Sequence, residues 1–205
     1  MRRRADARRL EILSAAARVF RRCGYADTSM REIAAEADLS SGNLYHYFSG
    51  KHELLFFCQD RALARMHSAL ESARDSGTSV LEQTRSVIES HVRCMLDEFE
   101  GATAHLQVEA LPEELRQQII EKRDAYEQAI RQLIVNGVEQ GEFAACDARL
   151  VTRAILGAAN WTAMWFRPEG EQSANDVAIA LAGYLVNGLI YGGELSVPRT
   201  RAAIS

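Results

Sequence analysis

Apolar residues recur every three or four positions along most of the chain, the spacing that gives a helix one buried face. Residues 79–193 show none of the strict alternation that predicts strands. The apolar pattern, with its capping and breaking residues, predicts helices over residues 7–23, 30–37, 42–48, 51–74, 79–100, 102–110, 112–140, 148–167 and 174–191. The sequence therefore predicts an all-α protein.

Capping signals mark two short helices in tandem near the N-terminus. Ser29, followed three residues later by Glu32, forms a capping box that opens the second predicted helix. The segment 38–40 breaks this helix. Ser40 or Ser41 then caps the next helix, because a serine oxygen accepts a hydrogen bond from an otherwise unpaired backbone N–H. Two short helices joined by so few residues predict a helix-turn-helix.

The second helix of this pair, over residues 42–48, has an apolar side and a polar side. Leu44 and Phe48, four residues apart, share the side that faces the core. The opposite side carries polar and aromatic groups, namely Asn43, Tyr45, His46 and Tyr47. A helix of this kind can enter the major groove of DNA. The pattern therefore indicates DNA binding.

The first quarter of the chain resembles the DNA-binding domain of the TetR family of transcriptional regulators. The resemblance is carried by Gly24, Tyr25, Thr28, Ile33, Ala34, Ala37, Gly42, Leu44, Tyr45, Tyr47, Phe48, Lys51, His52, Glu53, Leu54 and Leu55. It implies a helical homodimer that binds a palindromic operator and releases it when a small molecule fills the C-terminal domain. Residues 1–51 would form a three-helix helix-turn-helix domain, and residues 52–205 a helical effector-binding and dimerisation domain.

The residues expected to contact DNA fall into two groups. Those expected at base edges are Ser41, Gly42, Asn43 and Tyr45. Those expected at phosphates are Thr28, His46, Tyr47 and Lys51, and Ser29 belongs to the same surface. Lys51 opens a helix, where the helix dipole favours an anion, so its ammonium and the nearby backbone N–H groups predict a phosphate contact. The alternative is a solvated surface lysine.

Charge is distributed unevenly along the chain. Residues 1–51 contain ten Lys or Arg and six Asp or Glu, a net charge of +4, whereas the remainder carries 14 basic and 22 acidic residues, a net charge of −8. A basic unit on an acidic body suits a DNA-binding domain with a separate sensor domain. The first arginines, Arg2 to Arg4, predict either a basic arm that reaches phosphates or the minor groove, or a disordered tail.

Several other classes of protein are not indicated. The chain has no glycine-rich phosphate loop, nucleophile elbow or HExxH motif, so we expect no enzymatic activity and no cofactor. The four cysteines, Cys23, Cys58, Cys94 and Cys146, are far apart and predict neither a metal site nor a disulfide framework. No apolar run approaches the roughly 20 residues of a membrane span, and the arginine-rich start lacks a signal-peptide apolar region. We expect a cytoplasmic protein without a membrane partner.

Polar residues interrupt the apolar stripes of the C-terminal helices. His91 lies within such a stripe, as either a hydrogen-bonded core residue or a ligand contact. Arg123 lies on another stripe, close to Tyr126, and there needs an anion, which Glu109 or a ligand could supply. The alternative is an arginine that extends to solvent. These four residues, with the two tryptophans described next, are the expected effector contacts.

Trp161 and Trp165 lie one turn apart on the helix over 148–167, on a face shared with small alanines. Such a face is either a cavity wall or part of a core or interface. The stretch 160–170 resembles the C-terminal domain of TetR-type regulators that respond to acyl-CoA thioesters, or only a dimer interface of such a subfamily. The family resemblance implies that the last two helices pair with their copies in a four-helix bundle, which their small residues would permit. Packing within one chain is the alternative.

The expected function is therefore that of a ligand-responsive transcriptional regulator. It would be a repressor released from a palindromic operator when an apolar effector, foremost an acyl-CoA thioester, binds among the fifth, seventh and eighth predicted helices. One alternative is a multidrug or aromatic-ligand sensor of the same fold. The other is a constitutive DNA-binding dimer without a metabolite effector. The expected partners are double-stranded operator DNA, a small molecule and a second copy of the chain.

Overall fold

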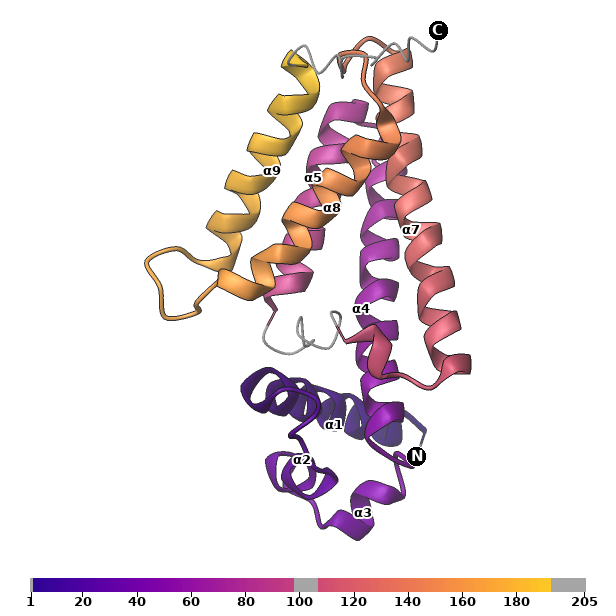
Figure 1. Cartoon of the computed structure of the whole chain (residues 1–205), viewed down its shortest axis with the longest axis vertical. Helices are drawn as coiled ribbons and strands as arrows, with labels where there is room; N and C mark the ends of the chain where they lie inside the picture. Colours follow the sequence, from indigo (N-terminus) through magenta and orange to yellow (C-terminus); the bar gives the residue numbers. More distant parts are fainter. Residues whose placement is uncertain (1, 98–106, 193–205) are drawn as a thin grey trace, which may run out of the picture.

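A computed structural model describes residues 2–97 and 107–192, and these two ranges form helices and turns without strands. The elements are α1 (Arg2–Cys23), α2 (Met30–Glu36), α3 (Ser41–Tyr45), α4 (Lys51–Arg74), α5 (Val80–Leu96), the short 3-10 helix η1 (Val108–Ala110), α7 (Glu113–Glu139), α8 (Ala148–Trp165) and α9 (Ala174–Tyr191). Helices α1 to α3 lie together at one end of the molecule, and α4 joins them to a bundle of the remaining helices (Figure 1). The all-α prediction, with an N-terminal helix-turn-helix unit and a C-terminal helical domain, is confirmed.

The first helix begins earlier than predicted. It starts at Arg2 instead of near residue 7. Residues 2–6 contain neither glycine nor proline, and arginine and alanine are good helix formers. Helix propensity therefore favours a helix here, against the unfavourable interaction of the first arginines with the helix dipole. The sequence predicted either a basic arm before the first helix or a disordered tail. The structure shows instead that this segment is part of α1.

Local side-chain hydrogen bonds define the helix-turn-helix. The capping box at the start of α2 is present, with the backbone N–H of Glu32 donating to Ser29 Oγ at 3.2 Å and the backbone N–H of Ser29 donating to Glu32 Oε2 at 2.7 Å. The helix ends at a left-handed residue, Asp38, with a φ of 54°. The backbone N–H of Leu39 then donates to the carbonyl oxygen of Ala34 at 2.8 Å, which closes the helix end in a Schellman motif.

Helix α3 is shorter than predicted but buries the expected residues. Ser40 is its N-cap and accepts a hydrogen bond from the backbone N–H of Asn43 at 3.2 Å. The helix ends at Tyr45 because the next two N–H groups bond to carbonyls three residues back, which is the geometry of a turn. Leu44 and Phe48 are both buried, as the spacing predicted.

The C-terminal bundle is arranged around α5, which packs against α4, α7, α8 and α9. Several helix ends differ from the predictions by a few residues. Helix α5 ends at Leu96 instead of residue 100, Pro112 is the N-cap of α7 instead of its first residue, and α8 ends at Trp165. Most of the helix predicted over 102–110 lies outside the described residues, and its described part is η1.

Helix α9 is apolar on both sides. Its 18 residues have a mean hydropathy of 1.2, so length and composition alone would allow it to cross a membrane, as they do for core helices of soluble proteins. In the structure Val177, Ala182 and Val186 are buried, whereas Tyr184 is 79% exposed and Tyr191 is exposed with it. A helix that packs on one side and exposes aromatic residues on the other has a surface suited to a second partner.

Gly137 on α7 lies against the buried ring of Phe143. A Cβ atom added to Gly137 would lie 2.2 Å from Cδ2 of that ring. We expect Gly137→Ala to destabilise the protein by about 1–3 kcal/mol, because the displaced ring costs more than the helix propensity of alanine contributes. In α8, a Cβ added to Gly157 meets nothing within 4 Å, so Gly157→Ala should stabilise by up to about 1 kcal/mol. Urea denaturation compares the two, and an unchanged stability of Gly137→Ala would contradict this packing.

Candidate functional site

The outward side of α3 presents the residues expected at base edges. Gly42, Asn43 and Tyr45 are exposed, with Tyr45 at 54%, and Ser41 is half-buried. His46, which was expected at a phosphate, is exposed directly after the helix. The N-cap Ser40 and the buried side chain of Leu44 hold α3 so that these residues face outward. Exposed amide and phenol groups on a short helix can reach base edges in a major groove.

Other residues of the predicted DNA-contacting surface have hydrogen bonds or packing contacts within the protein. The hydroxyl of Thr28 is buried and donates to the carbonyl oxygen of Gly24 at 2.6 Å. Ser29 Oγ donates to Glu32 Oε2 at 2.8 Å. Tyr47 is half-buried against the core. DNA contacts by these residues stay predictions, and in this conformation their first role is to hold the helix-turn-helix together.

Lys51 also has internal partners. Its ammonium donates to the carbonyl oxygens of Tyr25 at 2.7 Å, Ala26 at 3.1 Å and Thr28 at 2.8 Å, and lies 4.4 Å from the centre of the Tyr25 ring. Three acceptors match the three N–H bonds of a lysine. The interaction ties the start of α4 to the turn between α1 and α2. The phosphate contact predicted for Lys51 stays a prediction that would require at least one of these bonds to be exchanged.

The start of α4 also touches the C-terminal domain. The Tyr25 hydroxyl lies 2.7 Å from Nδ1 of His52, and the same nitrogen lies 3.0 Å from the carbonyl oxygen of Ala110 in η1. The imidazole therefore lies between the helix-turn-helix unit and the polypeptide that leads into α7. A movement of the helix-turn-helix unit relative to η1 would change the contacts of His52 with Tyr25 and Ala110.

A cavity of about 360 Å3 lies among α4, α5, α7 and α8. It is lined by Leu63, Met66, His91, Arg123, Asp124, Tyr126, Glu127, Arg153, Leu156, Gly157 and Asn160. The volume is within the range of small-molecule sites. Leu63, Met66 and Leu156 form an apolar part of the lining, and the rest is largely polar or charged.

Three hydrogen-bonded side chains form part of the cavity wall. His91 Nε2 lies 2.9 Å from Asn160 Oδ1, and His91 Nδ1 lies 3.3 Å from the hydroxyl of Tyr126. Because the amide oxygen only accepts, the imidazole donates from Nε2 and accepts at Nδ1 from Tyr126. The Tyr126 ring is stacked on His91 and meets the edge of His67. The arrangement leaves the amide NH2 of Asn160 available as a donor to a ligand.

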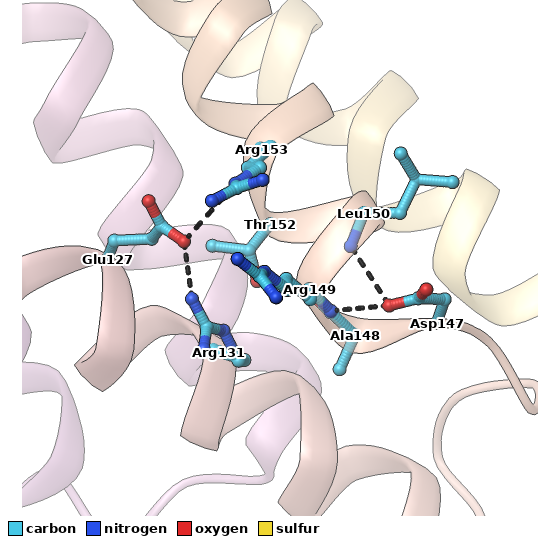
Figure 2. Close-up of polar contacts among 8 residues, drawn as sticks. All are labelled: Glu127, Arg131, Asp147, Ala148, Arg149, Leu150, Thr152 and Arg153. Carbon is cyan, nitrogen blue, oxygen red and sulfur yellow. Dashed lines mark hydrogen bonds and ion pairs between the residues drawn. The ribbon is translucent and has the colours of Figure 1, made fainter. Parts of the chain in front are cut away.

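Charged groups occupy the α7–α8 side of the cavity. Glu127 pairs with Arg131 on its own helix and with Arg153 on α8 at 3.6 Å (Figure 2). Arg123 donates to Gln59 Oε1 on α4 at 3.3 Å, and burial lowers the pKa of its guanidinium. The lining therefore contains two arginines, Arg123 and Arg153, whose charge is balanced by Asp124 and Glu127. An anionic part of a ligand would have to compete with these carboxylates for the guanidinium groups.

The environment of His91 predicts how stability changes with pH. Burial lowers its pKa to about 4, although the hydrogen bond with Asn160 acts in the opposite direction. The unfolded histidine, with a pKa of about 6.5, therefore binds a proton before the folded one. This contribution to stability is complete above about pH 6.5 and is lost as the pH falls towards 4. Between pH 7 and pH 5 the free energy of unfolding should therefore fall by about 2 kcal/mol because of His91.

Urea denaturation at pH 7 and pH 5, at one protein concentration, tests this expectation. The His91→Gln variant should lose about 2 kcal/mol less than the wild type over this interval. His46→Gln replaces an exposed histidine and keeps His91, so it should behave as the wild type does. Equal losses in the wild type and His91→Gln would contradict a buried neutral imidazole.

The structure brings only some of the predicted effector residues together. His91, Arg123 and Tyr126 line the cavity. Glu109 lies outside its lining and pairs with Arg116 at 3.1 Å. Trp161 and Trp165 do not line it either and are 62% and 48% exposed on α8. Effector contacts by these last three residues stay predictions without support from the cavity geometry.

Sequence reasoning missed the side of α8 that does line the cavity. Arg153, Gly157 and Asn160 follow one another at helical spacing on this side, so the signal was present next to the more conspicuous tryptophans. The contributions of α4, Leu63 and Met66, look like ordinary core residues in the sequence. Among the residues that the structure describes, no group of three or more His, Cys, Asp or Glu side chains could hold a metal ion.

Comparisons with known proteins agree with this arrangement. A family model described as "Tetracyclin repressor-like, C-terminal domain" matches residues 77–189, more than half of the chain, and one described as "Bacterial regulatory proteins, tetR family" matches residues 12–56. The transcriptional repressor KstR2 of Mycobacterium tuberculosis is 28% identical over 193 residues, covering 90% of this chain and 96% of the repressor.

Solved structures show the same fold. PfmR, a TetR family regulator from Thermus thermophilus, has a TM-score of 0.79 and 35% identity, covering 87% of this chain and 98% of PfmR. AibR, in a complex with isovaleryl coenzyme A and operator DNA, has a TM-score of 0.76 and 24% identity, covering 89% and 98%. These relatives are transcriptional regulators rather than enzymes. The chain belongs to the TetR family of bacterial DNA-binding transcriptional regulators.

Proposed function

We propose that this protein is a ligand-responsive repressor that leaves its operator when a small molecule enters the cavity among α4, α5, α7 and α8. The observation that carries the proposal is the course of α4. One helix of 24 residues supplies Lys51 and His52 to the helix-turn-helix unit and Leu63 and Met66 to the cavity wall. A rigid helix transmits a displacement that a flexible linker would absorb.

The mechanism follows from this shared helix. Leu63 lies 12 residues after Lys51, about 18 Å along the helix. A ligand that pushes on Leu63 would tilt the N-terminal end of α4. At that end Lys51 donates to the carbonyl oxygen of Tyr25, and His52 contacts the carbonyl oxygen of Ala110. In a dimer, the two copies of α3 would then no longer match half-sites about 34–36 Å apart. The ligand acts by favouring the conformer that cannot bind DNA.

The exposed apolar faces of α8 and α9 support a homodimer. Large apolar side chains gather on the outward sides of these two helices, namely Leu150, Trp161, Met164, Trp165, Ile179, Tyr184 and Tyr191. Their two copies, packed around a twofold axis, would bury this surface and place two copies of α3 against a palindrome. The site of action of such a bacterial regulator is the cytoplasm.

The favoured effector is an acyl-CoA thioester. The apolar part of the lining suits an acyl group, and the Asn160 amide can donate to a thioester carbonyl. Arg123 and Arg153 can bind an anionic group of the ligand in exchange for their present partners, Gln59 and Glu127. AibR, which shares the fold, binds isovaleryl coenzyme A. The alternatives are an aromatic or drug-like ligand and a regulator without an effector.

A thermal-shift screen of the purified protein tests the effector class. The panel contains acyl-CoAs with aliphatic and aromatic acyl groups, free fatty acids and lipophilic drugs, and stabilisation should grow with the ratio of ligand concentration to Kd. The proposal expects a rise with one acyl-CoA class and release of operator DNA at the same concentrations. Arg153→Gln should weaken this response, and Arg149→Gln, an exposed arginine outside the cavity lining, should leave it unchanged.

Other outcomes of the screen would support a different effector or none. A response to lipophilic drugs without a response to CoA esters would replace the thioester by a multidrug-type effector. Stabilisation by none of these compounds, with operator binding intact, would contradict the ligand-responsive mechanism and favour a constitutive DNA-binding dimer.

A further inference from the structure

A second hollow, of about 460 Å3, lies between the helix-turn-helix unit and the C-terminal bundle. It is formed by the last part of α1 and by the end of α8 with the turn that follows it. In Figure 1 the end of α8 lies on the side of the bundle that faces α1. Arg18, Arg21, Arg22 and Arg167 line this hollow, which we call the arginine groove.

Two of these arginines are already paired. Arg18 Nε donates to Glu36 Oε1 at 2.8 Å, and Arg22 Nη1 donates to Glu36 Oε2 at 3.2 Å. The same carboxylate serves both guanidinium groups. One negative charge therefore balances only half of the positive charge that these two residues bring to the groove.

The other two arginines have no carboxylate partner in the part of the chain that the structure describes. Arg21 is half-buried and makes no hydrogen bond or ion pair there. Arg167 donates only to the carbonyl oxygens of Met164 and Phe166 at the end of α8, at 3.5 and 3.1 Å. The lining contains four arginines and one carboxylate, that of Glu169. When the carboxylate of Glu36 is also subtracted, the groove has a net charge of +2.

This charge and shape indicate the chemistry of a ligand. A phosphate monoester carries −1.5 to −2 charges near neutral pH, which matches the excess charge of the groove. Guanidinium groups bind phosphate oxygens through paired N–H donors. Pro168 also lines the groove and is exposed, and its ring gives a base an apolar surface to contact.

We propose that the arginine groove binds the phosphate groups of a nucleotide-like ligand. A ligand there would contact α1 and the end of α8 together and so fix the angle between the DNA-binding unit and the bundle. The phosphates could belong to a free nucleotide or, resting on the function proposed above, to the nucleotide end of the CoA thioester. Both sources present the same chemistry to the groove.

Isothermal titration calorimetry with adenosine 3′,5′-bisphosphate at low salt tests the proposal. The wild type should bind the bisphosphate, and Arg21→Gln and Arg167→Gln should each weaken binding about tenfold or more, because each removes a charge-assisted contact. The matched control is Arg149→Gln at the other end of α8, whose guanidinium has no contact drawn in Figure 2 and lies outside the groove. This control should bind as the wild type does.

Three results would overturn the proposal. The first is the absence of binding to the wild type, and the second is equal binding by Arg21→Gln and Arg149→Gln. The third is a loss of operator affinity in Arg21→Gln with unchanged bisphosphate binding, which would assign the groove to the DNA surface. Arg21→Gln removes no bond within the described residues, so it keeps the test valid if Arg167→Gln fails to fold.

Competition distinguishes the two sources of phosphate. Displacement of the bisphosphate by an acyl-CoA would support the nucleotide end of a thioester, and simultaneous binding would support a separate nucleotide ligand. Operator binding is measured on the same samples. A wild type that binds the bisphosphate but releases no operator with any acyl-CoA would contradict the proposed effector while supporting the groove.

Discussion

The Asn43→Ala variant should lose most of its sequence-specific DNA binding and keep its fold. The Asn43 side chain is exposed on α3, and only its backbone N–H takes part in the cap with Ser40. An asparagine amide can form a bidentate pair with adenine, which contributes about 1–3 kcal/mol of discrimination. A dimer uses the residue twice, so operator affinity should fall by about 2–6 kcal/mol, roughly 30- to 20,000-fold.

Fluorescence anisotropy with operator DNA and with unrelated DNA measures this effect. Affinity for unrelated DNA should change little, because phosphate contacts supply most non-specific binding. Gln128→Ala on the exposed side of α7 removes the same functional group far from the helix-turn-helix and should leave both affinities unchanged. If Asn43→Ala and Gln128→Ala bound operator DNA equally well, α3 would not be the recognition helix.

A second large effect is expected from Tyr184→Glu on the outward face of α9. Tyr184 is 79% exposed in the single chain, so the substitution should not disturb the fold of a protomer. In the proposed dimer, twofold symmetry would bury two carboxylates in the interface, and uncompensated buried charges cost several kcal/mol. We expect monomers with the 22.8 kDa mass of one chain and a loss of operator binding, because a single half-site contact remains.

Analytical ultracentrifugation with parallel DNA binding checks this expectation. Trp161→Glu on α8 should have the same effect, since Trp161 is exposed beside the same surface. Gln128→Glu adds the same charge to an exposed position of α7 and should remain dimeric. Dimers of unchanged stability in both Tyr184→Glu and Trp161→Glu would rule out the α8–α9 interface.

Elements that depend on neighbouring residues were predictable from the sequence. The capping box of Ser29 and Glu32 and the serine cap of α3 are interactions over three residues, and the structure contains both. The burial of Leu44 and Phe48 follows from helical spacing. Helix ends were less predictable, because α3 passes into a turn after Tyr45 without a proline or glycine to mark the change.

Contacts between distant segments were not predictable in the same way. The burial of His91 was expected, but its bond to Asn160 joins residues 69 positions apart and depends on how α5 and α8 face one another. Glu109 was one of the anions that could have paired with Arg123, but it pairs with Arg116, which lies seven residues after it.

Side-chain type alone did not indicate the surroundings of the two tryptophans and of Lys51. Trp161 and Trp165 suggested a ligand wall, but the direction of α8 turns them outward. The ammonium of Lys51 suggested a phosphate contact, whereas three carbonyl oxygens in the turn after α1 surround it. In both cases the orientation of a helix in the assembled fold decides what its side chains meet.

The most direct test of the account is selection of DNA sequences by the purified full-length protein from a random double-stranded library. We expect a palindromic site whose half-sites are one helical turn, about 34–36 Å, or a multiple of it apart. Asn43→Ala should fail to enrich this site under the same conditions. Recovery of sequences without twofold symmetry, or of no preferred sequence by a folded wild-type protein, would contradict an operator-binding dimer that recognises DNA through α3.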